Sequence, residues 1–251
     1  MASRTTLPST ARRLPLLLAA LALSTGLAAC GSDDGDSTSS ATTEPATTQA
    51  TTASTETDAA NPDTGCKEVD APEPRTDEPD LPEPRPARLS GKWTVTFATS
   101  CGSFSFRLDT ARQPKTAASV ASLVKAKFFD GLSFHRIAQN PPIIQGGDPT
   151  GQGAGGPGYS VVEAPPKDAA YTRGIVAMAK TAAEAPGTSG SQFFVVTGAD
   201  AGLPPDYAIA GKITEGIDVA ERINQLGTAQ PTGDGPPAQV VVIEKATLKK
   251  G

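Results

Sequence analysis

The pattern of apolar residues becomes regular from about residue 92 onward. Lys92–Thr99 and Gly102–Leu108 alternate apolar and polar side chains, which is typical of half-buried strands, and the short link between them predicts a hairpin. A helix is expected to follow, because Pro114 suits a first turn and apolar residues recur at helical spacing as far as Val124. The other expected elements, in chain order, are strands at Phe134–Ile137, Ile143–Gln145, Gly174–Ala179, Gln192–Thr197 and Tyr207–Ile213, a short helix near Gly216–Gln225, and a strand at Gln239–Thr247. Many short strands with two helices indicate a mainly β domain, closed into an antiparallel barrel.

The N-terminus has the pattern of an export signal. Three arginines among the first 13 residues precede the apolar run Leu14–Leu23, which is too short to span a bilayer. The run ends in small residues before Cys30, and this ending resembles a bacterial lipobox. We therefore expect residues 1–29 to be a lipoprotein signal peptide and Cys30 to carry lipid, which would anchor the protein at the extracytoplasmic face of the cell membrane. The alternative is an ordinary secretory signal with a chance cysteine.

Composition separates the next segment from the rest of the chain. Residues 30–90 are poor in apolar side chains and rich in Ser, Thr, Ala, Pro and acids, so we expect a disordered tether there. Residues 31–90 hold 14 Asp and Glu against 4 Lys and Arg, whereas residues 91–251 hold 13 against 15. The domain expected at residues 91–251 is therefore nearly neutral, and its charge gives no indication of a nucleic-acid partner.

The candidate chemistry gathers in Phe134–Tyr159, which contains the only histidine of the chain. Simple strand alternation would place Phe134 and Arg136 on one face, and His135 and Ile137 on the other. Gln145 ends the next apolar run, so Arg136 and Gln145 could converge on one surface. The segment after Gln145 is so rich in glycine that it must be a shaped loop.

Other interpretations of the motifs are weaker. The glycines from Gly151 match the spacing of a nucleotide-binding loop, but no helix can begin at Pro157–Gly158 to receive a phosphate. His135 lacks a second histidine or a cysteine pair with which to share a metal, so a packed histidine is favoured. The GTSGS sequence at Gly187 lacks the spacing of a serine-hydrolase elbow.

Several motifs in order resemble one known family. FHRI at Phe134 and QGGDPTGQGAGGPGY at Gln145 are joined by GSFSFRLD, PKTAASVASLVKAKFFDGLSFHRI, RGIVAMA, GTSGSQFFVVTG and a GKI after Tyr207. Together they resemble the cyclophilin-type peptidyl-prolyl cis-trans isomerases, above all the bacterial branch, over roughly Trp93–Lys245. The resemblance implies that residues 91–251 form a closed eight-stranded antiparallel β-barrel with one helix over each open end.

The resemblance also implies an activity and its residues. It implies isomerisation of X-Pro bonds in proline-containing polypeptides, here exported chains, by a monomer that needs no cofactor or metal. Arg136 would stabilise the twisted amide and Gln145 would position Arg136 and contact the peptide. The substrate site would be lined by Phe134, Met178, Ala179, Gln192, Phe194, Leu203 and Tyr207.

Three positions depart from the usual pattern of this family. Pro142 and Gly202 stand where aromatic residues are common, and Ala210 stands where phenylalanine is usual. These departures predict a shallower proline pocket and weak inhibition by cyclosporin. They also leave open an alternative function, a catalytically weak peptide-binding or chaperone module.

The two remaining cysteines are expected to pair. If Cys30 carries lipid, Cys66 and Cys101 remain, and an export signal implies a compartment in which disulfides persist. We therefore expect a Cys66–Cys101 disulfide.

Overall fold

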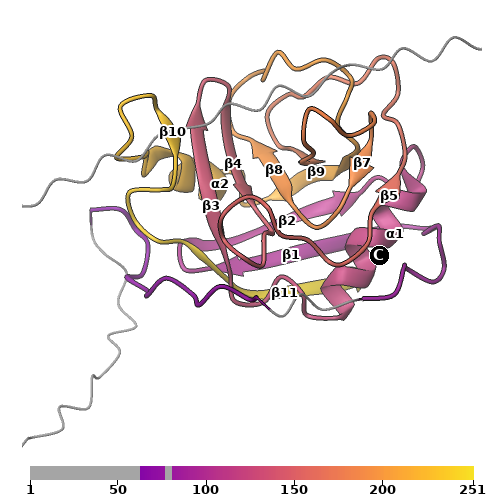
Figure 1. Ribbon diagram of the computed structural model, residues 1–251, viewed down its shortest axis with the longest axis horizontal. Coiled ribbons are helices and arrows are strands. Elements are labelled where there is room, and N and C mark those ends of the chain that lie inside the picture. Colours follow the sequence, from indigo (N-terminus) through magenta and orange to yellow (C-terminus); the bar gives the residue numbers. More distant parts are fainter. Residues whose placement is uncertain (1–62, 77–80) are drawn as a thin grey trace, which may run out of the picture. The chain divides into compact units, whose positions relative to one another are not determined.

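The computed structural model describes residues 63–76 and 81–251, and the strands in this part of the chain close into a barrel (Figure 1). The strand order around the barrel is β3-β11-β1-β2-β9-β6-β8-β4, and β4 pairs with β3 to complete it. Every pairing is antiparallel. The barrel strands are β1 (Trp93–Thr99), β2 (Gly102–Leu108), β3 (Leu132–Gln139), β4 (Pro142–Gly146), β6 (Ile175–Met178), β8 (Phe193–Val196), β9 (Ile209–Glu215) and β11 (Val242–Lys250). The eight-stranded antiparallel barrel predicted from the sequence is thus confirmed.

Three two-residue strands extend this framework. The strand β5 (Val161–Val162) pairs with β7 (Thr188–Ser189), separately from the barrel. The strand β10 (Asp234–Gly235) pairs with the C-terminal part of β3, on the edge that β11 occupies at the start of β3. A segment near the C-terminus of the chain is therefore brought beside the end of β3 that carries Ile137 and Ala138.

Phenylalanine rings fill the inside of the barrel. Phe97 lies among four other rings, and the distances between its ring centroid and theirs range from 5.2 to 5.7 Å. The partners are Phe104, Phe106, Phe129 and Phe193, all of them buried. Tilted and edge-to-face aromatic pairs of this kind add to the stability that burial provides. The interior of the barrel is therefore filled by side chains, and a substrate site is expected on its outer surface.

Two helices complete the domain. The helix α1 (Pro114–Lys125) starts with its proline in the first turn and packs against β9 and β11. It buries the apolar stripe that the sequence predicts. The helix α2 (Ile217–Gln225) packs against β2, β3 and β4. Gly216, just before α2, has φ 75°, and a Cβ there would lie 2.3 Å from the carbonyl oxygen of Ser103, so this turn requires glycine. Within the described ranges, no helix combines the length and apolar character needed to cross a membrane.

Part of the segment that we expected to be a disordered tether is ordered. Residues 63–76 and 81–90, here called the N-terminal strap, hydrogen-bond to the domain through the backbone N–H groups of Lys67, Arg75, Leu81 and Leu89. The guanidinium of Arg75 donates to the carbonyl oxygens of Phe128 and Asp130. The expectation of disorder was wrong for the strap, because backbone hydrogen bonds and a few anchoring side chains hold it, and composition does not register them. The expected signal peptide, Cys30 and the first half of the tether lie outside the described residues.

The predicted disulfide is present in the structure. Cys66 of the strap is bonded to Cys101, which lies in the turn between β1 and β2. Both cysteines are buried. The strap is therefore fastened covalently to the barrel as well as by hydrogen bonds.

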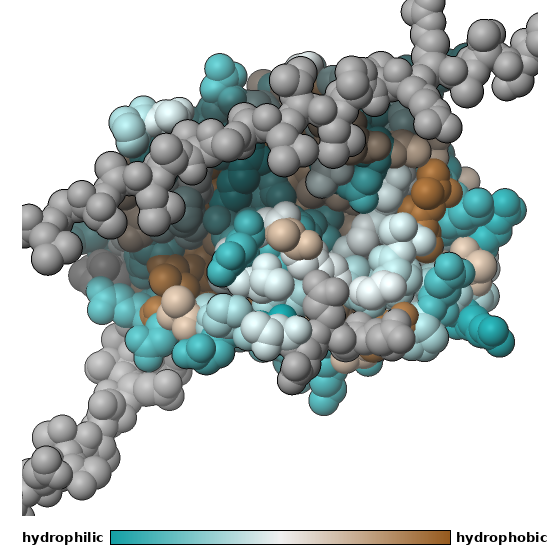
Figure 2. Space-filling view, viewed as in Figure 1, coloured by the Kyte–Doolittle hydropathy of each residue, from teal (hydrophilic) through white to brown (hydrophobic). Residues whose placement is uncertain are grey.

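The outer surface is mixed in character. On the face shown in Figure 2, hydrophobic side chains form small separate patches among hydrophilic and intermediate ones. Among the described residues, Val162, which is 52% exposed, is the one large hydrophobic side chain classed as exposed. Any binding site for an apolar group must therefore be built from side chains that are largely buried.

Candidate active site

A β-bulge in β3 decides where Arg136 points. Phe134 pairs with Gly146 and Arg136 with Gln145, so that His135 is an extra residue opposite β4. The bulge allows Phe134 and Ile137 both to join the core inside the barrel, and it brings Arg136 beside Gln145. The predicted alternation was therefore wrong at this point. Arg136 does not share a face with Phe134, because the extra residue shifts the register.

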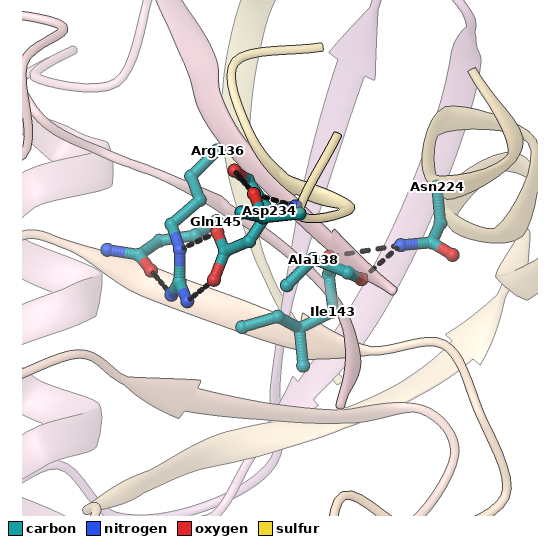
Figure 3. A network of polar contacts seen from close by, with 7 residues as sticks. Arg136, Ala138, Ile143, Gln145, Asn224 and Asp234 are labelled. Carbon is teal, nitrogen blue, oxygen red and sulfur yellow. Dashed lines mark hydrogen bonds and ion pairs between the residues drawn. The ribbon is translucent and has the colours of Figure 1, made fainter. Parts of the chain in front are cut away.

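Arg136 is held by two side chains (Figure 3). Its Nη1 donates to Oε1 of Gln145 at 2.9 Å, as expected from the sequence. Its Nε and Nη2 donate to Oδ1 and Oδ2 of Asp234, each at 2.6 Å. The hydrogen bond between them is the main reason that the pKa of Arg136 is raised and the pKa of Asp234 is lowered. Sequence reasoning missed Asp234, which lies 98 positions away on β10 and carries no motif.

Gln145 is itself held by Gln192, the residue just before β8. Its Nε2 donates to Oε1 of Gln192 at 3.1 Å, and Nε2 of Gln192 donates to the carbonyl oxygen of Gly155 at 3.0 Å. Three polar side chains predicted as site residues are thus linked in one chain of hydrogen bonds, from Arg136 to the glycine-rich loop. Each amide oxygen in this chain accepts and each amide nitrogen donates, which fixes the orientation of both glutamines.

A buried carboxylate shapes the glycine-rich loop. Asp148, which is 1% exposed, accepts hydrogen bonds from the N–H groups of Thr150, Gly153, Ala154 and Gly155. Burial alone would raise the pKa of Asp148, but the hydrogen bonds from Thr150 and Gly153 outweigh it and the pKa is lowered. A Cβ on Gly155 would lie 2.4 Å from Oδ1 of Asp148, so glycine is required there. Asp148 closes its own loop, and the acid that pairs with Arg136 is Asp234.

An apolar cluster packs on the strands that carry these polar groups. Phe194 of β8 lies opposite Gln145 of β4 in the sheet, and its ring centroid is 5.4 Å from that of Tyr207. The rest of this cluster includes Ile143, Tyr171 and, partly buried, Ala179, Leu203 and Tyr207. The cluster is separate from the core inside the barrel. Of the residues predicted to line a substrate site, it contains Ala179, Phe194, Leu203 and Tyr207.

The sequence missed two members of this cluster that matter for its shape. The hydroxyl of Tyr171 donates to the carbonyl oxygen of Tyr207 at 2.6 Å and accepts from the N–H of Tyr207 at 2.9 Å. Tyr171 thus fixes the backbone that presents Tyr207. Ile143 follows Pro142 in β4 and belongs to the same cluster as Phe194. The alternation of Ile143 and Ile144 along β4 was the available signal, since Ile144 belongs to the core inside the barrel.

Two residues predicted to contact substrate lie elsewhere. Phe134 is 1% exposed and packs against Phe104 and Phe193 inside the barrel. Met178 is fully buried and lines an internal cavity of about 10 Å³. In β6 the side chains alternate, so Ala177 joins the outer cluster while Met178 faces the core. The predicted roles of Phe134 and Met178 in holding a substrate do not fit these positions.

The departures from the family pattern also have specific positions. We had expected Ala210 to lie at the floor of an outer proline pocket. Instead, it lines the internal cavity together with Met178. Gly202 is exposed, and a Cβ there would meet no atom within 4 Å. Pro142 opens β4 and packs against Gly198. A larger side chain is therefore missing at Gly202 on the surface, whereas the effect of Ala210 is inside the barrel.

His135 is a packed residue. Both its ring nitrogens are buried and lack a hydrogen-bond partner among the described residues. Burial lowers the pKa of His135, and the charge of Asp148 opposes this effect while that of Arg136 adds to it. In the described part of the chain, no three His, Cys, Asp or Glu side chains come close enough together to hold a metal ion.

Comparison with known proteins agrees with this arrangement. The sequence model of the family described as "Cyclophilin type peptidyl-prolyl cis-trans isomerase/CLD" matches residues 94–248. A probable peptidyl-prolyl cis-trans isomerase B of Mycobacterium leprae is 36% identical over 170 residues, which are 62% of this chain and 56% of that protein. The chain therefore spans just over half the length of this relative. Peptidyl-prolyl cis-trans isomerase A of Mycobacterium tuberculosis is 34% identical over 173 residues, and 91% of its length is covered.

Solved structures show the same fold. A crystal structure of a cyclophilin type peptidyl-prolyl cis-trans isomerase of Cryptosporidium parvum superposes with a TM-score of 0.57 at 27% sequence identity. The match covers 64% of this chain and 99% of that one. A second structure of the same protein, in the presence of the dipeptide Ala-Pro, gives a TM-score of 0.56. From the matched family model, the relatives and the barrel together, the chain belongs to the cyclophilin-type peptidyl-prolyl cis-trans isomerase family.

Proposed function

We propose that this protein catalyses cis-trans isomerisation of X-Pro peptide bonds. The observation that carries the proposal is the position of Arg136, a charged donor held by Gln145 of β4, which in turn pairs in the sheet with Phe194 of the apolar cluster. An X-Pro bond isomerises over a barrier of about 18–20 kcal/mol because rotation breaks the amide resonance. Rotation needs no bond cleavage, so neither a nucleophile nor a metal is required.

In this proposal each part of the site has a distinct task. The apolar cluster holds the proline ring, and Gln192 and the backbone at Ala179 hold the flanking peptide. As the amide twists, its nitrogen becomes pyramidal and gains a lone pair, to which an N–H of Arg136 donates. That interaction exists mainly in the transition state, so it lowers the barrier without tightening substrate binding. Gln145 keeps the guanidinium oriented.

We further propose that the protein acts as a lipid-anchored monomer outside the cytoplasm, on exported chains. The arginines and the apolar run before Cys30 support export and lipid attachment. The Cys66–Cys101 disulfide is compatible with an oxidising compartment.

A second candidate function is a peptide-binding or chaperone module with little catalysis. Gly202 favours it, because it leaves the surface beside Leu203 without an aromatic side chain.

A protease-free isomerisation assay separates the two functions. The full-length protein, purified in detergent, would be mixed with a short Ala-Pro peptide, and the cis-trans exchange rate would be measured by NMR exchange spectroscopy. Catalysis at substoichiometric enzyme that is lost in Arg136→Ala supports the isomerase. Peptide binding with no acceleration of exchange supports the binding module.

A further inference from the structure

The hydrogen bonds of Arg136 leave a defined part of its guanidinium free. The group carries five N–H bonds. Asp234 accepts from Nε–H and from one N–H of Nη2, and Gln145 accepts from one N–H of Nη1. A carboxylate that binds Nε and Nη2 occupies the side edge of the guanidinium plane. In the part of the chain that the structure describes, these bonds leave one N–H on each Nη nitrogen for another partner.

The fold places Asp234 opposite Arg136 for a local reason. Asp234 pairs with Ala138 in the sheet, two residues after Arg136. The N–H of Gln139 donates to the carbonyl oxygen of Gly233 at 2.9 Å, and Gly233 has φ 69°, a left-handed conformation that glycine adopts readily. The chain therefore turns sharply just before Asp234 and lays β10 along β3.

The helix α2 holds the paired strands β3 and β4 near the same place. Nδ2 of Asn224 donates to the carbonyl oxygens of Ala138 and Ile143, both at 3.0 Å (Figure 3). Nε2 of Gln139 donates to the carbonyl oxygen of Asn224. These hydrogen bonds fix the backbone of β3 and β4 next to Arg136. The orientation of the guanidinium then depends on the partners of the Arg136 side chain.

We propose that Asp234 is a positioning residue for isomerisation, which holds the guanidinium of Arg136 so that its two remaining N–H groups are presented to the substrate. This inference rests on the proposed function. A long arginine side chain has many rotamers, and fixing it before substrate arrives removes an entropy cost from the transition state. Without Asp234, the bond to Gln145 alone would leave the guanidinium free to rotate.

The exposure of the pair separates this role from a structural one. The side chains of Arg136 and Asp234 are 38% and 42% exposed. Exposed ion pairs contribute little to folding stability, typically about 0–1 kcal/mol. Loss of Asp234 should therefore appear in the catalytic step and hardly at all in the melting temperature.

The test compares three variants of the full-length protein in detergent by steady-state kinetics on an Ala-Pro peptide. Asp234→Ala should lower kcat about tenfold and change KM less than about twofold, because misorientation of a catalytic group acts on the transition state. Asp234→Asn should recover part of the loss, since its amide oxygen still accepts one N–H. Glu221→Ala is the matched control, because it breaks the exposed ion pair with Arg173 and should leave kcat unchanged. A kcat for Asp234→Ala equal to or above that of the wild type would overturn the proposal, and would make Asp234 a competitor of the substrate.

Two further measurements distinguish failure of this inference from failure of the proposed function. In an Arg136→Ala background, Asp234→Ala should change nothing further, because the two residues act through one interaction. An additional loss in that background would overturn the positioning role. The NMR signal of the Arg136 Nε–H should be sharp in the wild type and broadened in Asp234→Ala, and an unchanged signal would overturn the inference without reference to activity. A wild-type protein that has the sharp signal but accelerates no exchange would instead refute the proposed function.

Discussion

The side-chain amide of Gln145 donates to the amide oxygen of Gln192, so the residue that holds Arg136 from β4 is itself held by the residue just before β8. Gln192 in turn donates to the carbonyl oxygen of Gly155. Together with Asp234 of β10, residues from four segments of the chain thus determine the orientation of one guanidinium.

Arg136→Ala should remove most of the catalytic efficiency. We expect kcat/KM to fall about 10²–10³-fold, the usual cost of losing one preorganised donor, with peptide affinity nearly unchanged. Arg136→Lys should not recover it, because a compact ammonium cannot bind Asp234 and Gln145 together and still donate to the substrate. Exchange spectroscopy gives kcat/KM and titration gives the affinity. Activity within threefold of wild type in a folded Arg136→Ala variant would contradict the mechanism.

Met178→Ala and Phe194→Ala should have different consequences. Met178 lies in the barrel core, so its truncation should cost about 2–5 kcal/mol of unfolding free energy while each folded molecule stays active. Phe194 belongs to the outer cluster, so Phe194→Ala should lower kcat/KM at least about tenfold even after correction for the folded fraction. Urea titration and the exchange assay measure the two effects. If Met178→Ala lost more kcat/KM per folded molecule than Phe194→Ala, the assignment of the substrate site to the outer cluster would be wrong.

Stability should fall as the pH drops below about 6.5, because of His135. Burial lowers the pKa of His135 in the folded state, whereas the unfolded state keeps the ordinary value near 6.5. Below that value the unfolded state binds the proton first, and unfolding is favoured. The charged groups facing this ring are Asp148, which opposes the shift, and Arg136, which adds to it. Urea midpoints at pH 7.5 and 5.5 should differ less in His135→Phe, and an equal difference in both proteins would refute this prediction.

Loss of the disulfide should release the N-terminal strap. In Cys66→Ala we expect the amide protons of Lys67 and Arg75 to exchange faster, and the unfolding free energy to fall by up to about 3–4 kcal/mol. The loss is an upper value, because the strap also keeps its hydrogen bonds to the barrel. Hydrogen exchange followed by mass spectrometry measures the first effect. If the unreduced, denatured wild-type protein shows free thiols at both Cys66 and Cys101, the bond is absent in solution.

Cys30 should carry lipid. Wild-type protein is expected in the membrane fraction of a bacterial host, and Cys30→Ser should be released or misprocessed. Cys66→Ser is the control, since it removes a cysteine without touching the proposed attachment site. A wild-type protein recovered from the medium with an unmodified N-terminus would contradict the lipobox interpretation.

The sequence was sufficient for the fold because its information is local and repeated. Alternation located β1 and β2 to within a residue or two, the strands expected at Gly174–Ala179 and Gln192–Thr197 contain β6 and β8, and Pro114 marked the start of α1. Gln145 and Gln192 were found through motifs that lie on adjacent strands. These features depend on neighbours in the chain or on patterns known from relatives.

The remaining features depend on contacts that local pattern does not contain. The bulge at His135 changes the face on which the residues after it lie, so alternation wrongly placed Phe134 and Arg136 on one face. Asp234 reaches Arg136 across 98 positions and carries no motif of its own. Met178 was assigned by resemblance, although alternation along β6 would have sent it inward. The strap has the composition of a tether, and its order comes from partners far away in the sequence.

If Cys30 carries lipid, the disulfide at Cys66 limits the length of chain that connects the lipid anchor to the barrel. Because Cys66 is bonded to Cys101, the length of chain between Cys30 and its attachment to the barrel is counted from Cys30 to Cys66 and not to residue 90. Even fully stretched, that length reaches about 120 Å, against about 200 Å for a tether ending at residue 90. In the proposed lipid-anchored form, Cys66 could therefore lie no farther than about 120 Å from the attachment site at Cys30.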